Sequence, residues 1–168
     1  MDSKASIIKS IDAFIRKYYK NKLLKGILIA GSLIFSLFLI VVLSEYFVYF
    51  SVTVRTFIFW AFIVAIASSL IYYVAIPWLK MHKLGNCISY EEASVIIGNH
   101  FPEIKDKLLN LLQLTHIQDV QSADLLQSSI EQKTAQIKPV PILEAIDLKQ
   151  NKKYVKYILP PVLVIVLL

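Results

Sequence analysis

The sequence predicts an all-α membrane protein with an N-terminal amphipathic helix, a two-helix transmembrane hairpin, a small cytoplasmic helical segment and the start of a third transmembrane helix. Three observations lead to this prediction. Hydrophobic residues make up 57% of the 168 residues and charged residues 18%, whereas soluble domains contain roughly 25% charged residues. Two long runs lack ionisable side chains altogether. The polar segments around them repeat their apolar residues at helical spacing.

Residues 1–25 are the first predicted element, a basic amphipathic helix. Apolar residues recur at positions 7, 8, 11, 14, 15, 18 and 19, and Lys9, Arg16, Lys17 and Lys20 fall between them. A basic helix of this kind beside a transmembrane span is typical of a helix that lies on the membrane surface, and we expect that arrangement. Packing on the cytoplasmic segment and direct extension of the first span are the alternatives.

Residues 26–44 and 56–79 are two predicted transmembrane helices, which together make the hairpin 26–79. The first run has 19 residues, which cover roughly 28 Å at about 1.5 Å per residue, close to the ~30 Å of the hydrocarbon core. The second run has 24 residues and can span with some tilt. Because the connection, residues 45–54, is too short for a domain, the two helices are expected to lie antiparallel.

Small residues recur every four positions in both runs. This small-residue stripe comprises Gly26, Ala30, Ala61, Ala65 and Ser69. Small side chains let helix backbones approach closely. We therefore expect the stripe to pack the hairpin on itself, with self-association of the chain as the alternative.

The basic residues indicate the orientation of the spans. Residues 1–25 carry seven basic groups, Arg55 alone lies between the two runs, and Lys80 and Lys83 follow the second run. Because Lys and Arg are enriched in cytoplasmic flanks, the N-terminus and the chain from residue 80 onward are predicted to be cytoplasmic.

Residues 80–156 are the predicted cytoplasmic segment, with three short helices. Ser89 and Glu92 have the spacing of a capping box, in which the serine oxygen accepts a backbone N–H and the glutamate accepts the serine's own N–H. We expect the helix that starts there to close near Gly98. Pro102 opens a second amphipathic helix.

Residues 121–137 are the third predicted helix of this segment, and the KPVP sequence at 138–141 ends it. A further helical stretch is expected from Asn151 into the final apolar run. The core of such a small bundle would be thin. Its predicted members are Ile96, Ile97, Phe101, Leu108, Leu111, Leu112, Leu126 and Ile130.

Residues 157–168 are predicted to begin a third transmembrane helix. The uncharged run from residue 158 to residue 168 has 11 residues, roughly 16 Å as a helix and about half a bilayer. Pro160 and Pro161 suit the first turn of a helix, where N–H groups have no partner inside the helix. We expect the chain to be the front part of a longer protein. A complete small protein with a buried or re-entrant tail is the alternative.

The sequence predicts no catalytic, cofactor-binding or metal-binding site. His82, Cys87, His100 and His116 match no metal-ligand spacing, and glycine patterns for phosphate or dinucleotide binding are missing. The two spans lack the ionisable residues that mark ion paths. The basic excess lies beside a span rather than on a folded domain, which argues against a nucleic-acid partner, and no small-molecule substrate is evident.

Four phrases of the chain are distinctive together. They are DAFIRKYYKN, SYEEASVIIGNHFPEIKDKLLN, SIEQKTAQIKPVP and AIDLKQNKKYVKYILPP. Together they resemble the N-terminal part of a large uncharacterised family of Bacteroidetes membrane proteins, classed as a domain of unknown function. The resemblance covers nearly the whole chain and implies a longer protein of the bacterial inner membrane with an extended helical region afterwards. It implies no catalytic residue.

These observations favour a non-catalytic inner-membrane anchor and helical docking segment of a longer envelope protein. Its expected partners are the lipid bilayer and either another protein or a second copy of the chain. A subunit of an oligomeric membrane channel or translocation assembly is one alternative. The other is the membrane anchor of an enzyme whose active site lies beyond Leu168.

Overall fold

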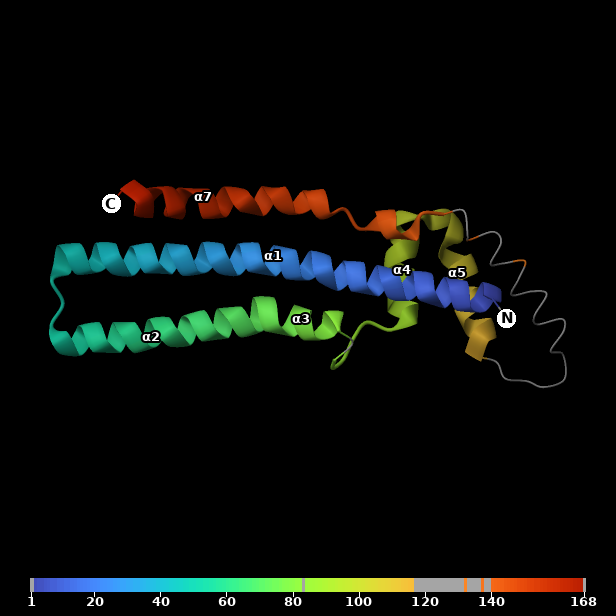
Figure 1. The fold of residues 1–168 in the computed structure, drawn as a ribbon, viewed down its shortest axis with the longest axis horizontal. Coiled ribbons are helices and arrows are strands. Elements are labelled where there is room, and N and C mark those ends of the chain that lie inside the picture. The colour runs from blue at the N-terminus through green and yellow to red at the C-terminus, as the bar shows by residue number, and fades with distance from the viewer. Residues whose placement is uncertain (1, 83, 117–131, 133–136, 138–139, 168) are drawn as a thin grey trace. The chain divides into compact units, whose positions relative to one another are not determined.

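A computed structural model describes residues 2–82, 84–116, 132, 137 and 140–167. In these residues every regular element is a helix, so the predicted all-α class is confirmed. Figure 1 shows the elements in chain order.

The chain divides into two compact units, which we call unit 1 and unit 2. Unit 1 comprises Met1–Tyr18 and Asn86–Asp147, and unit 2 comprises Tyr19–Gly85 and Leu148–Leu168. The first 18 residues, predicted as a separate surface helix, therefore cluster with the predicted cytoplasmic segment.

Helix α1, Asp2–Val48, is a single helix of 47 residues. The predicted boundary at residue 25 does not interrupt it. Gly26 and Gly31 each lower helix stability by about 1 kcal/mol relative to alanine, but glycine keeps its N–H and the ladder of hydrogen bonds continues. Hydropathy marks a change of surroundings at this point, while the backbone remains helical.

The apolar face of the first turns of α1 is buried inside unit 1, which differs from the expected membrane-surface position. Ile11 and Phe14 are fully buried, and Ile7 and Ile15 nearly so. Burying such side chains stabilises the unit by about 1.5–3 kcal/mol each. This segment therefore adopts the alternative arrangement, packing on the downstream helices.

Helices α4 and α5 provide the opposing part of the core of unit 1. Helix α4 covers Tyr90–His100 and α5 covers Pro102–His116. Four predicted core residues are buried, whereas Ile96 and Phe101 are half-buried, and Leu126 and Ile130 lie outside the described residues. The buried hydrophobic residues of this part of unit 1 are Ala93, Ile97, Ile104, Leu108, Leu111, Leu112, Ile137, Ile142 and Ile146.

Gly98 lies inside α4 rather than at its end. A Cβ added to Gly98 would approach the Cβ of Lys105 on α5 to 2.7 Å and its Cα to 3.0 Å. The glycine therefore allows the backbones of α4 and α5 to approach closely, and α4 continues to His100. The helix thus ends two residues after Gly98, near the position expected, while the glycine itself serves the packing of α4 on α5.

The predicted capping box at the start of α4 is present. The Oγ of Ser89 accepts the N–H of Glu92 at 3.1 Å, and a carboxylate oxygen of Glu92 accepts the N–H of Ser89 at 3.1 Å. Both N–H groups would otherwise lack a partner within the helix.

We expect Ser89→Ala to destabilise the first turn of α4 by about 1 kcal/mol, because the N–H of Glu92 loses its acceptor. The corresponding measurement is amide hydrogen exchange at Glu92, which should become roughly fivefold faster. Ser89→Asn restores a capping oxygen and serves as the control. Unchanged exchange in the alanine variant would contradict the capping role.

Side-chain hydrogen bonds join the first turns of α1 to the rest of unit 1. The hydroxyl of Tyr90 donates to a carboxylate oxygen of Asp12 at 3.1 Å. The ammonium of Lys17 donates to the backbone carbonyl of Leu143 at 2.7 Å, in the short helix η3, Ile142–Ala145.

The third predicted helix, 121–137, lies almost wholly outside the described residues.

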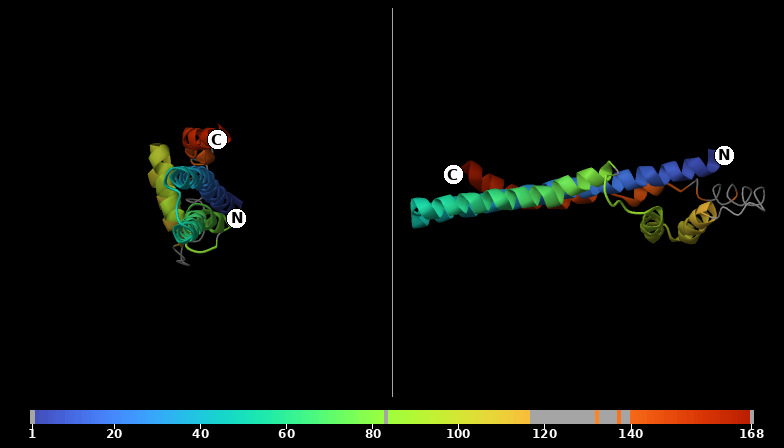
Figure 2. Two further views of the ribbon diagram at one scale, coloured as in Figure 1. Left: turned by 90° about the vertical axis from the view of Figure 1, so that its left-hand side faces the viewer. Right: turned by 90° about the horizontal axis from the view of Figure 1, so that it is seen from below.

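Unit 2 contains the predicted hairpin, with longer helices and a shorter turn than expected. Helix α2, Val52–Leu70, continues through a π-helical turn η1, Ile71–Ala75, into α3, Ile76–Met81. It runs antiparallel beside α1, as Figures 1 and 2 show. The turn consists of residues 49–51 instead of the predicted 45–54, and Tyr49 has a positive φ of 50° there.

The last part of unit 2 is helix α7, Lys152–Leu167, which follows the short helix η4, Leu148–Asn151. It lies beside α1 and runs in the same direction (Figure 1). Pro160 and Pro161 lie inside α7, so the prediction that they occupy its first turn is wrong. The helix begins before the apolar run, since the lysine-rich residues 152–156 are also helical.

Candidate membrane interface

The helices of unit 2 expose a long apolar surface. Two helical segments, Ser6–Val48 and Val52–Met81, are long and apolar enough to cross a membrane, and only 11% and 6% of their most apolar windows are buried. Phe57, Trp60 and Val64 on α2 are 76%, 62% and 62% exposed. The core helix of a soluble protein buries such residues, whereas an apolar surface of this extent marks a contact with lipid or protein.

Charge is divided unequally between the two units. Unit 2 contains ten Lys and Arg residues and one acidic residue, and unit 1 contains eight basic and eleven acidic residues. Their formal charges are +9 and −3, which together give the +6 of the chain.

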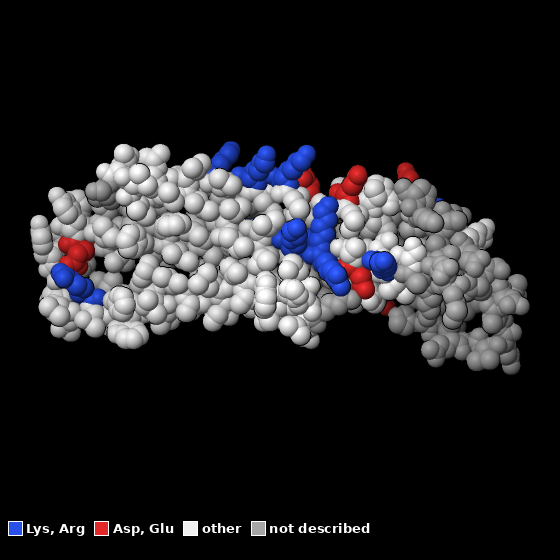
Figure 3. Space-filling model, in the orientation of Figure 1, with Lys and Arg blue, Asp and Glu red and all other residues white. Residues whose placement is uncertain are grey.

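Eight lysines among the described residues of unit 2 flank its apolar helices at one end, and we call them the lysine belt. They precede the apolar part of α1, lie in the last turn of α3 and occupy η4 and the first turns of α7. Figure 3 shows blue side chains over the start of α7 and near α3, and a white surface along α2. The lysine belt consists of Lys20, Lys22, Lys25, Lys80, Lys149, Lys152, Lys153 and Lys156.

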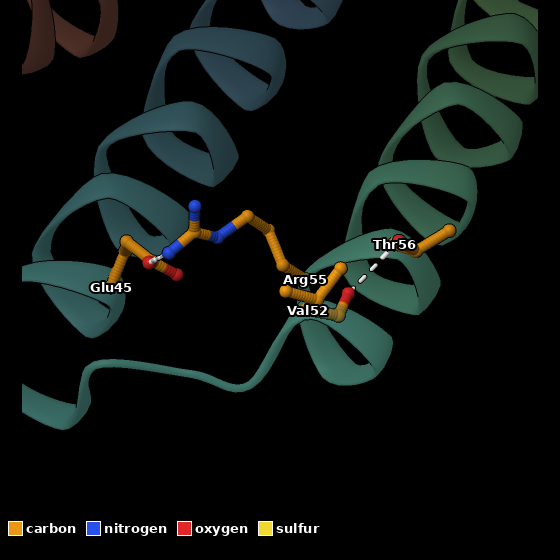
Figure 4. Close-up of polar contacts among 4 residues, drawn as sticks. All are labelled: Glu45, Val52, Arg55 and Thr56. Atoms are coloured by element: carbon orange, nitrogen blue, oxygen red, sulfur yellow. Dashed lines mark hydrogen bonds and ion pairs between the residues drawn. The ribbon is translucent and has the colours of Figure 1, made fainter.

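The opposite end of the hairpin has one ion pair. Glu45 near the end of α1 accepts a hydrogen bond from the guanidinium of Arg55 on α2 (Figure 4). These are the two charged residues between residues 26 and 79, and their side chains are 34% and 64% exposed. A pair this exposed contributes at most about 1 kcal/mol, but it neutralises both charges at the edge of the apolar surface.

Gly26 of the predicted stripe is a point of close approach between α1 and the second helix. A Cβ added to Gly26 would overlap the carbonyl oxygen of Tyr73 and lie 2.9 Å from its carbonyl carbon. In a regular α-helix the donor to this carbonyl would be the N–H of residue 77, which is Pro77 and has none. It points at a Cα–H group of the glycine, a contact that recurs at helix–helix interfaces.

The π-helical turn at Ile71–Ala75 is the local response to the same proline. The N–H of Ile76 bonds the carbonyl of Ile71, five residues back. Membrane helices accommodate proline by such local changes of register and by contacts with neighbouring helices. Both adjustments occur here, as the π-helical turn and as the contact of the Tyr73 carbonyl with Gly26. Pro77 is the sequence signal for them.

A second proline acts in the same way on α7. In a regular helix the N–H of residue 161 would bond the carbonyl of Tyr157, and Pro161 has no N–H. The hydroxyl of Ser32 on α1 donates to that carbonyl at 2.9 Å. The Ser32 hydroxyl therefore takes the place of the helical donor that the proline lacks.

The small-residue stripe is only partly interior. Gly26, Ala30 and Ser69 are buried, Ala65 is half-buried and Ala61 is exposed. The Oγ of Ser69 has no hydrogen-bond partner in the described part of the chain, so Ser69 acts there as a small residue. The close approach of α1 to the second helix is therefore at the lysine-belt end of the hairpin.

Two polar contacts between α1 and the C-terminal part of unit 2 were not predicted from the sequence. The side-chain amide of Asn151 donates to the Oδ1 of Asn21 at 2.6 Å. The ammonium of Lys25 lies 5.1 Å from the ring centroid of Tyr154 and, as a hydrogen-bond donor and positive charge, lowers the pKa of the Tyr154 hydroxyl. The only sequence signal for these two contacts is the presence of asparagine and lysine beside an apolar run.

The residues considered for metal binding lie apart from this interface or in aromatic contacts. The His82 ring packs on Trp78 at 5.0 Å between centroids, and the His100 ring packs on Phe101 at 4.8 Å. Cys87 is half-buried. Over the described ranges, no three His, Cys, Asp or Glu residues are grouped so that they could hold a metal ion.

The candidate membrane interface is therefore defined by the contacts and charges of its own residues. Comparison of the chain with protein-family models, with curated proteins and with solved structures finds no match in any of the three.

Proposed function

We propose that this chain is a non-catalytic anchor of the bacterial inner membrane that holds unit 1 on the cytoplasmic side as a helical docking segment. The observation that carries the proposal is the exposure of the two long apolar helices, of which only 11% and 6% are buried in their most apolar windows. Transferring that surface from water to lipid is favourable by about 25 cal/mol per Å². A bilayer supplies the apolar surroundings that the chain itself does not.

The lysine belt supports the orientation. Its eight residues flank the apolar helices at one end, while the other end carries Arg55 paired with Glu45. Lysine-rich flanks remain on the cytoplasmic side of a membrane helix and are attracted to its anionic lipids. The N-terminus, unit 1 and the lysine belt are therefore assigned to the cytoplasm.

The net charge of unit 1 supports the docking role. At −3, unit 1 is repelled by the negative potential of the cytoplasmic lipid surface, which extends over about a Debye length. A unit that the lipid surface does not attract keeps its helices available to a protein partner.

Cysteine labelling in intact cells tests the topology. In a Cys87→Ser background, Ser51→Cys lies in the hairpin turn and Asn99→Cys on the exposed side of α4. We expect a membrane-impermeant maleimide to label position 51 in intact cells and position 99 only after permeabilisation. Labelling of position 99 in intact cells, or recovery of the chain in the soluble fraction, would contradict the proposed anchor.

A further inference from the structure

A pocket lies within the lysine belt, between α1 and the second helix. Its volume is about 400 Å³, within the range of small-molecule sites. Three lysines line it, together with two tyrosines and an apolar floor. The lining is Lys22, Lys25 and Lys80, with Tyr72 and Tyr73, Gly26, and the floor residues Ile29, Ile76 and Pro77.

The pocket is built on the π-helical turn. Ile71–Ala75 supplies both tyrosines, and the contact of Gly26 with the Tyr73 carbonyl closes one side. π-helical turns of this kind are frequent at functional sites. The wall that carries the tyrosines is thus fixed by the same close contact that holds the hairpin together.

Unit 2, which contains the pocket, carries a formal charge of +9. The acidic residue of this unit, Glu45, pairs with Arg55 at the opposite end of the hairpin. Ammonium groups at the cytoplasmic end of membrane helices attract phosphate head groups, at about 1 kcal/mol per lysine near the surface. Tyrosine hydroxyls at this depth donate hydrogen bonds to the same oxygens.

We propose that this pocket, which we call the head-group pocket, binds the phosphodiester of an anionic glycerophospholipid, with the acyl chains along the apolar floor. The inference rests on the proposed membrane anchoring. The site requires both a negative charge for its lysines and an apolar chain for Ile29, Ile76 and Pro77. A free phosphate ion satisfies only the first requirement, and a zwitterionic lipid carries a cationic amine in its head group that the lysines repel.

Fluorescence quenching of Trp78 tests the head-group pocket in the full chain. Trp60→Phe leaves Trp78 as the single tryptophan; it adjoins the lining residue Pro77 and is 48% exposed. The chain is reconstituted in phosphatidylcholine vesicles with either brominated phosphatidylglycerol or brominated phosphatidylcholine. We expect about tenfold tighter apparent binding of the anionic lipid.

Matched lysine variants separate the pocket from general charge. Replacing the three pocket lysines with glutamine should reduce the preference to about twofold or less, whereas replacing them with arginine should retain it. Lys152, Lys153 and Lys156 lie in the lysine belt outside the pocket, and their glutamine replacement removes the same charge. That control should keep most of the tenfold preference, and an equal loss in both glutamine variants would overturn the pocket.

Two further outcomes distinguish the possible failures. Displacement of the brominated lipid by millimolar inorganic phosphate would overturn the lipid assignment, because a free ion would then suffice. Vesicle flotation is measured on the same samples. A chain that floats without preferring the anionic lipid overturns only the head-group pocket, whereas a chain that does not float overturns the membrane anchor and the pocket with it.

Discussion

Gly26→Ala should destabilise the packing of α1 on the second helix by about 1–3 kcal/mol, the usual effect of forcing one extra carbon into a closely packed contact. The added Cβ would overlap the carbonyl oxygen of Tyr73. That oxygen belongs to the backbone, so it cannot move aside as the end of a flexible side chain can. The helices must separate or the π-helical turn must rearrange.

Gly31→Ala is the matched control, because it makes the same change five residues along the same helix. A Cβ at Gly31 would lie 3.7 Å from the Cδ1 of Ile158, an ordinary van der Waals distance. Since alanine favours a helix over glycine by about 1 kcal/mol, this variant should be as stable as the parent or slightly more stable.

The measurement is the free energy of unfolding in mixed detergent micelles, followed by tryptophan fluorescence as the denaturing detergent increases. Equal stability of the two alanine variants would show that the approach at Gly26 is not tight in solution. A loss confined to Gly26→Ala would identify the contact with Tyr73 as the one that holds the hairpin together at the lysine-belt end.

Hydropathy and local motifs were sufficient to predict the class, the two apolar helices and the capping box of Ser89 and Glu92. Each depends on residues close in sequence. Helix boundaries were less accurate, because the loss of apolar character at residues 25 and 45 does not remove backbone hydrogen bonds. Helix α1 therefore continues through both positions.

Non-local packing accounts for the other differences. Ile11 and Phe14 belong to the core of unit 1 because Ala93, Ile97 and Leu108 complete that core from far along the chain. Their helical spacing predicted an apolar face, but spacing does not state whether lipid or protein covers it. Gly26 differs from the other stripe residues because it faces the Tyr73 carbonyl, which lacks its α-helical donor. That donor is missing because residue 77, 51 positions after Gly26, is a proline.

Pro77 and Pro161 have the same effect on helix packing in unit 2. Each proline leaves a carbonyl without its helical donor, and α1 approaches that carbonyl, at Gly26 in one case and at Ser32 in the other. In lipid an unsatisfied carbonyl costs several kcal/mol, so each contact gives a neighbouring helix a defined register along α1. The prolines therefore contribute to the specificity of helix pairing.

Ser32→Ala should destabilise unit 2 by about 1 kcal/mol, the usual value of a hydrogen bond between membrane helices, because the Tyr157 carbonyl loses the hydroxyl that bonds it at 2.9 Å. Pro161→Ala should remove that dependence, since the substituted alanine supplies the missing N–H to the same carbonyl. It should also stabilise α7 on its own, by up to about 3 kcal/mol from helix propensity.

A double-mutant cycle over Ser32 and Pro161 isolates this effect, with unfolding free energies measured in mixed micelles. The loss from Ser32→Ala should be about 1 kcal/mol with Pro161 and less than about 0.5 kcal/mol in the Pro161→Ala background. Ser44→Ala is the matched control, because the Ser44 hydroxyl bonds Ile40 within its own helix; its effect should not depend on the residue at position 161. Equal losses from Ser32→Ala in both backgrounds would mean that the hydroxyl stabilises α7 by packing alone, and that the proline does not select its partner.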